Sequence, residues 1–327
     1  MLGTLLRTGS AAMLALLPLT VLAQSDAVAT YPNKPVRLVV GFTPGSATDV
    51  TARMFAQKFT EAWGVTVAVD NIPGVGGAVG VARVAKAPPD GYTLMYSGNG
   101  ALTILPTLQT KPLYDVTRDL TPISMVLTMP SILAVNNEVP TKTLQELIAY
   151  AKVPSRKLSY ASPGSGTPQH IAIELLKGME RIDIAHIPYK GAVFTDVIGG
   201  RVPMTIQNAG SILPVVRDGR LRGLAVTSLK RSPNMPDLPT FAESGYPGFE
   251  AVSWFALLAP AGTPAGIRAK VHQESMKVIA NAEMRARFAQ LGMDIDARTG
   301  DEVTAIIKTD IDKWAKVIKD AGITMTD

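Results

Sequence analysis

The feature that most constrains the fold is a repeated alternation of short apolar runs with longer amphipathic segments, which starts after Pro35. The runs are rich in β-branched residues, as strands are, and the segments between them carry apolar residues at helical spacing. The first series predicts a strand at 36–42, a helix over 47–63, a strand at 65–69, a short helix near 76–87 and a strand at 92–96. Strands that alternate with helices predict a parallel sheet with helices on both faces.

The same alternation occurs a second time. It predicts strands at 132–135, 158–161 and 184–188, helices at 144–151 and 168–177, and further apolar runs at 204–207 and 221–227. Two closing helices, near 264–291 with a break at Asn281 and over 302–321, are expected to cover the first lobe. The predicted fold is therefore α/β with two lobes, each a mostly parallel sheet flanked by helices.

The expected lobe boundaries follow from this order. Lobe 1 comprises residues 24–122 plus 252–327, and lobe 2 comprises residues 123–251. Open parallel sheets bind ligands beyond the carboxyl ends of their strands. We therefore expect the ligand cleft between the two lobes.

The N-terminus contains a short apolar segment, AAMLALLPLTVLA at 11–23, which follows Arg7 and ends in small residues. At about a dozen residues it is shorter than the roughly 20 needed to span a bilayer, and Pro18 interrupts it. This pattern predicts a signal peptide over residues 1–23, cleaved after Ala23, and hence an exported chain. An N-terminal membrane anchor is the alternative interpretation.

Composition excludes several classes of function. The chain has no cysteine, which excludes a disulfide scaffold, a thiolate metal site and a cysteine nucleophile. A net charge of +5 without basic runs does not indicate a nucleic-acid partner. The three histidines, His170, His186 and His272, lack the spacing of metal ligands, so no metal is expected. No nucleophile–base pair can be assembled, so no enzyme is expected either.

A glycine-rich run at 74–80, GVGGAVG, nearly matches a dinucleotide-binding fingerprint. Val79 occupies the position of the third glycine, and the run follows the second predicted strand instead of the first. No nucleotide or other cofactor is therefore expected.

A loop that contains Gly45, Ser46 and Asp49 follows the first predicted strand and leads directly into the first helix. Ser46 with Asp49 three residues later matches a capping box, and in one interpretation both residues only satisfy the first N–H groups of the helix. The other interpretation adds a bound anion, because Gly45 lets the backbone approach a ligand and the helix start attracts negative charge. The two roles are compatible.

A similar loop, SPGSGTPQH at 162–170, follows a strand of the second series. Thr167 can cap the following helix, and Pro168 suits its first position. The candidate binding residues of this loop are Ser162, Gly164, Gly166, Thr167 and His170. Two helix N-termini that face each other across one cleft suit a ligand with acceptors at both ends, most simply a dicarboxylate.

Polar residues also follow other predicted strands. Ser97, Gly98 and Asn99 come after the strand at 92–96, and Asn208 comes after the run at 204–207. We expect them at the cleft, although a hydroxyl or amide near a strand end is as often only a turn former.

Motifs along most of the chain resemble the extracytoplasmic solute receptors of tripartite tricarboxylate transporters, also called the Bug family. These motifs are YPNKPV at 31–36, PGSATD at 44–49, VDNIPGVGG at 69–77, APPDGYTL at 87–94, YASPG at 160–164, HIPYKG at 186–191 and LAVT at 224–227. The resemblance implies a periplasmic-binding-protein-like fold that closes on a small carboxylate.

The resemblance also implies roles for individual residues. Those in the first lobe are Phe42, Gly45, Ser46 and Asp49, and those in the second are Ser162, Gly164, Thr167 and His170, with Tyr189, Asp196 and Asn208. Asp196 suits either a ligand ammonium group or the cap of its own helix. The family usually has a second glycine where Ser46 stands, so the arrangement of water around the ligand is expected to differ.

The function that the resemblance implies is a periplasmic receptor that delivers a carboxylate to the permease subunits of a membrane transporter. Di- and tricarboxylates, amino acids and aromatic acids are all ligands of such receptors, and the sequence does not choose among them. A second hypothesis is that the liganded receptor docks on a sensor kinase. An exported hydrolase is a remote third.

Overall fold

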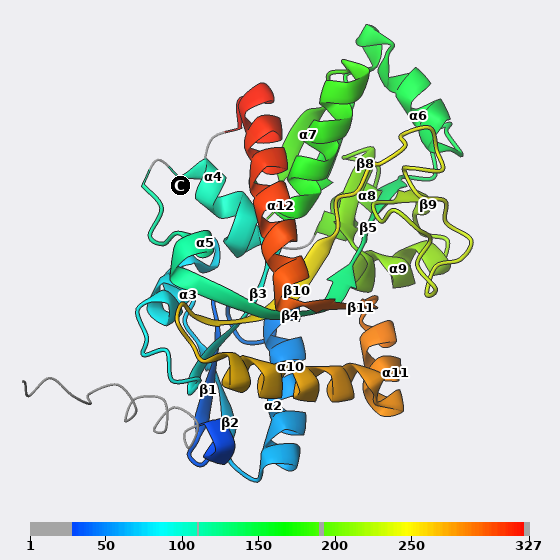
Figure 1. Ribbon diagram of the computed structural model, residues 1–327. Coiled ribbons are helices and arrows are strands. Elements are labelled where there is room, and N and C mark those ends of the chain that lie inside the picture. Colours follow the sequence, from blue (N-terminus) through cyan, green and yellow to red (C-terminus); the bar gives the residue numbers. More distant parts are fainter. Residues whose placement is uncertain (1–27, 110, 190–192, 324–327) are drawn as a thin grey trace, which may run out of the picture.

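The computed structural model describes residues 28–109, 111–189 and 193–323, arranged as two sheets with helices on both faces of each (Figure 1). The predicted signal peptide and its cleavage site lie outside the described residues. Among the residues that are described, no helix combines the length and the apolar character needed to cross a bilayer.

The first sheet has six strands in the order β11-β4-β10-β3-β1-β2. Their bounds are β1 Val36–Val40, β2 Val67–Asn71, β3 Thr93–Gly98, β4 Leu120–Met129, β10 Ser253–Pro260 and β11 Asp294–Thr299. The second sheet has five strands in the order β7-β6-β8-β5-β9. Their bounds are β5 Ser131–Val135, β6 Ser159–Ser162, β7 Ala185–Pro188, β8 Met204–Asn208 and β9 Arg222–Val226. The predicted two-lobed α/β fold is confirmed.

The strand directions differ from the predicted mostly parallel sheets. The β1–β2, β1–β3, β6–β7 and β6–β8 pairs are parallel, as the strand–helix–strand order requires. The remaining pairs are antiparallel, so both sheets are mixed. The reason is the double crossing between lobes: β4 leaves the first lobe and β10 returns to it beside β4, with Ser253 opposite Met129.

The chain crosses between the sheets at Pro130 and again at 251–252. The expected boundary at 122/123 falls within β4, all of whose residues belong to the six-stranded sheet, and the boundary at 251/252 lies just before β10. The side chain of Asn99 donates to the carbonyl of Val252 at 2.9 Å and ties the end of β3 to the second crossing.

The longer helices follow the sequence signals closely. They are α2 Ala47–Trp63, α3 Ala78–Ala85, α6 Leu144–Ala151, α7 Pro168–Glu180, α9 Ala209–Arg217, α10 Ala265–Ala280, α11 Ala282–Gln290 and α12 Gly300–Asp320. The short ones are η1 Val75–Gly77, η2 Gly100–Ile104, α4 Leu105–Leu108, α5 Val116–Asp119, η3 Pro154–Arg156 and α8 Val193–Ile198. The expected break at Asn281 is present, and its side chain caps α11 by accepting the Met284 N–H at 3.1 Å.

Each face of each sheet carries its own apolar cluster. On α2, a stripe of Ala52, Phe55 and Phe59 is fully buried against the first sheet, and Trp63 stacks on Phe59 with ring centroids 4.6 Å apart. Helices α10 and α11 cover the same face, as expected. Burial of these aromatic side chains contributes about 1.5–3 kcal/mol each.

Helix α12 differs from the expectation that it covers the first lobe alone. Val303 and Ile307, in its first half, pack in a first-lobe cluster, whereas Trp314 and Ile318 pack with the second-lobe core. In Figure 1 this helix (red) runs from the first sheet up along α7 (green), with which it is in contact. One helix thus contributes to the cores of both lobes.

The lobes also touch near the end of α11. A Cβ on Gly210, at the start of α9, would overlap the carbonyl of Leu291, so the backbones of the two lobes meet there. Close by, the Asp294 carboxylate accepts hydrogen bonds from Ser232 at 2.8 Å and from Asn234 at 3.1 Å. The two lobes are therefore joined at this point by a backbone contact and by polar side chains.

Candidate functional site

The first-lobe loop joins β1 to α2 and contains Gly45 in a left-handed conformation, with φ +85°. Ser46 is the N-cap of α2, and its hydroxyl accepts the Asp49 N–H at 3.2 Å. The predicted cap is therefore present. Since a side chain is strained at this backbone angle, glycine suits position 45.

Asp49 is 2% exposed and braces the loop. Its carboxylate accepts the Gly45 N–H at 2.9 Å, the Asn71 amide at 2.8 Å and the Arg53 guanidinium at 2.9 Å. The predicted capping box is thus only half formed, because the carboxylate reaches the N–H of Gly45 instead of that of Ser46. With these partners, Asp49 positions the loop and is not free to contact an anion.

The ionisation of Asp49 reflects these contacts. Burial acts to raise the pKa of its carboxyl, but the hydrogen bonds from Arg53, the Gly45 N–H and Asn71 outweigh burial and hold the pKa below its ordinary value. The carboxylate is therefore charged at neutral pH and paired with Arg53.

The start of α2 keeps two donors for a ligand. Within the described residues, the backbone N–H groups of Ala47 and Thr48 donate to no other residue. They lie in the first turn, where the helix dipole also favours negative charge. This helix end can bind one anionic group.

Phe42 and the glycine-rich run pack against this loop. The Phe42 ring lies over Gly77, where a Cβ would be 3.2 Å from the ring. A Cβ on Gly41 would lie 2.6 Å from the Gly77 carbonyl oxygen, and one on Gly80 would lie 2.8 Å from the Gly41 Cα. The glycines at 41, 77 and 80 therefore allow η1 and α3 to approach the end of β1, which accounts for them without a nucleotide.

The second-lobe loop joins β6 to α7 and also contains left-handed glycines, Gly164 with φ +145° and Gly166 with φ +74°. Thr167 is the N-cap of α7: its hydroxyl accepts the His170 N–H at 3.3 Å and donates to the Gly164 carbonyl at 2.8 Å. Ser162 accepts the Gly164 N–H at 3.1 Å. The loop is thus internally cross-linked.

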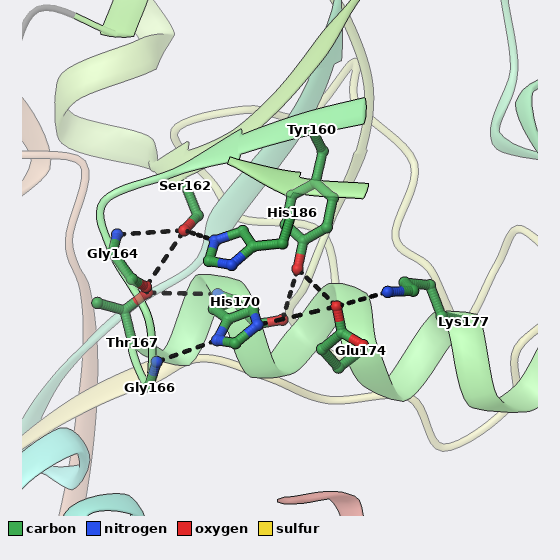
Figure 2. A network of polar contacts seen from close by, with 9 residues as sticks. All are labelled: Tyr160, Ser162, Gly164, Gly166, Thr167, His170, Glu174, Lys177 and His186. Atoms are coloured by element: carbon green, nitrogen blue, oxygen red, sulfur yellow. Dashed lines mark hydrogen bonds and ion pairs between the residues drawn. The ribbon is translucent and has the colours of Figure 1, made fainter. Parts of the chain in front are cut away.

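Two histidines contact this loop, the buried His170 and the half-buried His186 (Figure 2). His170 Nδ1 accepts the Gly166 N–H at 3.0 Å, and His186 Nε2 lies 2.6 Å from the Ser162 hydroxyl. The two imidazole rings stack with centroids 3.9 Å apart and an interplanar angle of 11°. His186 is not among the site residues expected from the sequence, because only the pairing of β6 with β7 brings it beside Ser162.

The charged side chains nearest the two histidines, Glu174 and Lys177, lie on α7. Glu174 accepts the Tyr160 hydroxyl at 2.9 Å and the Lys177 ammonium at 2.8 Å, and it lies 3.8 Å from His170 Nε2. Burial, the neighbouring His186 and Lys177 together lower the pKa of His170 to about 3. Burial also lowers the pKa of His186, aided by Lys177 and opposed by Glu174. Both rings are neutral at pH 7.

The second loop likewise keeps two donors for a ligand. The backbone N–H groups of Ser165 and Gln169 have no acceptor among the residues that the structure describes. The Gln169 side chain donates to the Ser131 hydroxyl at 3.0 Å and to Asn208. Asn208 is therefore bound to α7, near the crossing from β4 to β5.

The helical segment over η2 and α4 contacts the second-lobe loop and η1. A Cβ on Gly166 would lie 2.9 Å from the Leu108 Cδ1 atom, so the second-lobe loop rests on the end of α4. On the same segment, Ala101 would be 3.1 Å from a Cβ on Gly77, beneath Phe42. The segment over η2 and α4 thus lies between the second-lobe loop and the glycine-rich run on which Phe42 packs. Five pockets in the described part of the chain are lined by residues that belong to neither loop.

The remaining predicted residues have partners of their own or lie within the sheet. Ser97 is fully buried opposite Ala256, and its hydroxyl has no partner among the described residues. Tyr189 donates to Asp196 at 2.7 Å, and Asp196 also pairs with Arg201 at 2.5 Å. Among the described residues, no three His, Asp or Glu side chains form a group that could hold a metal ion.

Comparison with known proteins gives one consistent family. The sequence profile of the "Tripartite tricarboxylate transporter family receptor" matches residues 51–323. Protein BugT of Bordetella pertussis is 35% identical over 300 residues, which cover 90% of this chain and 91% of BugT.

Solved structures of similar proteins agree. The structure of Rpa4515 from R. palustris with adipate is 33% identical, with a TM-score of 0.77 over 90% of this chain and 99% of that one. The structure of MatC from Rhodopseudomonas palustris with bound malate is 28% identical, with a TM-score of 0.74 over 88% of this chain and 100% of that one.

These matches confirm the family that the motifs indicate, and that family consists of solute receptors, not of enzymes. The chain therefore belongs to the receptor family of the tripartite tricarboxylate transporters, a family of periplasmic solute-binding proteins.

Proposed function

We propose that this receptor binds a small dicarboxylate between its two lobes, with one carboxylate at the start of α2 and the other at the start of α7. The observation that carries the proposal is the matched pair of glycine loops. Each opens a helix of at least 13 residues, and each leaves two backbone N–H groups without a protein acceptor in the described chain. Such helix starts bind anions through N–H groups and the helix dipole.

The relatives support a dicarboxylate over the other ligand classes. Adipate and malate, the molecules present in the Rpa4515 and MatC structures, both carry a carboxylate at each end. An amino acid would need an acidic partner for its ammonium group. Asp196, the predicted candidate, is already engaged by Tyr189 and Arg201.

The donors are sufficient for useful affinity. Each hydrogen bond to a charged group contributes about 1.5–3 kcal/mol. Four such bonds, less the cost of association, are compatible with the roughly −8 kcal/mol of micromolar binding. No lysine or arginine is required to contact the ligand.

Closure of the lobes would complete the site. The two crossings, at Pro130 and at 251–252, form the proposed hinge between the first lobe and the second. A ligand that contacts both loops binds only the closed arrangement fully and therefore shifts the population toward it. The closed receptor would then dock on the membrane subunits of the transporter for which the family is named.

Calorimetric titration with malate, adipate, glutamate and benzoate tests the ligand class. We expect micromolar binding of at least one dicarboxylate and none of benzoate. Binding of none of the four by the folded protein would contradict the proposal.

The variant Ala47→Pro tests the place of binding. Ala47 is the first residue of α2, where proline is tolerated, and Ser46 already has the extended conformation that precedes proline, with ψ 157°. The change removes one free N–H and keeps the helix, so dicarboxylate affinity should fall at least about tenfold. Ala282→Pro, the same change at the start of α11, is the control and should bind normally.

A further inference from the structure

The turn between β6 and α7 is held by two histidines of the elements beside it, His170 on α7 and His186 on β7. His170 accepts the Gly166 N–H, and His186 lies against the Ser162 hydroxyl, so both ends of the loop rest on imidazole nitrogens (Figure 2). Ser165, one of the two residues with a free N–H, lies between these fastened points. The direction of that N–H depends on them.

The bond to Gly166 fixes the state of His170. An imidazole nitrogen that accepts an N–H carries no proton, so His170 is neutral with its proton on Nε2. Nε2 lies on the side of Glu174, 3.8 Å from its carboxylate and so beyond hydrogen-bond distance. His170 thus has both nitrogens directed at the protein, and it acts on a ligand only through the loop.

The surroundings favour a neutral pair. The two rings are stacked at 3.9 Å, and a charge on both would place two cations in a buried space. Tyr160 on β6 and Glu174 and Lys177 on α7 are the ionisable groups in contact, with Glu174 already neutralised by Lys177. Lys313 and Lys316 of α12 line the groove on which Glu174 and Lys177 also border.

We propose that His170 and His186 are positioning residues, which as a neutral stacked pair hold the second-lobe loop with its free N–H groups toward the second carboxylate of the ligand. That the histidines hold the loop rests on the geometry of the ligand-free protein. That the loop in turn affects ligand binding rests on the proposed function. The two parts can therefore be tested separately.

Nuclear magnetic resonance of the ligand-free protein tests whether His170 is neutral and accepts the Gly166 N–H. The ¹⁵N shifts of His170 should show the Nε2–H tautomer from pH 8 down to pH 5, without titration. A proton on Nδ1, or an ordinary titration in that range, would overturn the inference. This measurement uses the unaltered chain and does not depend on the folding of any variant.

Paired variants then test the effect on the loop. His170→Leu removes the acceptor of the Gly166 N–H, so exchange of that amide should accelerate roughly tenfold, whereas His170→Asn supplies another acceptor and should restore much of the protection. For His186, Leu and Gln form the corresponding pair at Ser162. His272→Gln is the control, since His272 also lies against a serine, Ser124 at 2.7 Å, but in the first lobe.

Affinity for malate and adipate measures the effect of these variants on ligand binding. We expect roughly three- to tenfold weaker binding for the leucine variants, recovery in the amide variants and no change for His272→Gln. Unchanged Gly166 exchange and unchanged affinity in His170→Leu would refute the positioning role. Faster exchange with unchanged affinity would refute the link to the ligand, and a wild type that binds neither probe would instead refute the proposed function.

Discussion

The backbone N–H of Gly45 donates to the carboxylate of Asp49 across 2.9 Å, so the loop that precedes α2 is fastened to the first turn of that helix. Arg53 and Asn71 hold the same carboxylate from the other side. A buried acid therefore determines the shape of a loop whose expected ligand is itself an anion.

Asp49→Ala should cost about 1–3 kcal/mol of folding stability, because it removes the acceptor of three donors. It should also weaken dicarboxylate binding by releasing Gly45. Urea denaturation and calorimetric titration measure the two effects. Asp70→Ala is the matched control, since Asp70 forms only a part-exposed pair with Arg37 and should change stability by less than about 1 kcal/mol. Equal effects of the two variants would contradict the bracing role.

Gly45→Ala and Gly64→Ala separate backbone strain from ligand contact. Both glycines have positive φ, +85° and +68°, and a Cβ on either would meet nothing within 4 Å. Each change should therefore cost a similar stability, of about 1–2 kcal/mol. Gly64 ends α2, whereas Gly45 precedes its start, so only Gly45→Ala should weaken binding. Thermal denaturation and titration of both variants test this, and a loss of affinity in Gly64→Ala would contradict it.

Gly166→Ala should disturb the contact between the second-lobe loop and α4, because its Cβ would lie 2.9 Å from the Leu108 side chain. Leu108→Ala in the same chain should relieve that overlap but not the backbone strain at φ +74°. A double-mutant cycle on adipate affinity should therefore give a coupling of about 0.5–3 kcal/mol. Strict additivity of the two changes would show that Leu108 does not support the loop.

Stability should fall on mild acidification because the fold keeps His170 and His186 neutral. In the unfolded chain they titrate near the ordinary pKa of about 6.5, whereas the folded pKa of His170 is about 3. Below pH 6.5 the unfolded state therefore binds protons that the folded state does not, and stability falls by up to about 1.4 kcal/mol per pH unit for this residue. Above pH 6.5 the contribution is fully present.

Urea denaturation at intervals from pH 7.5 to pH 5 measures this slope. His170→Asn, which does not titrate, should have a visibly shallower slope in the same range. Identical slopes in the two proteins would mean that His170 is not held neutral by the fold.

The parts of the fold with local signals could be predicted from the sequence. The expected helix over 47–63 coincides with α2, because Ser46 caps its start, an apolar stripe fixes its face and Gly64 ends it in a left-handed conformation. Strand β4 was not anticipated. Its partners β10 and β11 lie more than 100 residues later in the chain, and no local sequence signal at 120–129 indicates that pairing.

The same distinction holds for the site. Glycine, serine and threonine at the helix starts predicted both loops, because turn and cap chemistry is local. The groups that brace those loops come from elsewhere: Asn71 lies 22 residues from Asp49, and His186 lies 24 residues from Ser162. Only strand pairing brings them into contact, so the sequence indicates which residues open each helix but not which distant side chains hold the loops.

The course of α12 across both lobes affects the order in which the molecule folds. The second lobe is encoded in the middle of the chain, yet Trp314 and Ile318 complete its apolar interior. That lobe lacks part of its core until α12 has docked, so the two halves should reach their final packing together instead of one after the other.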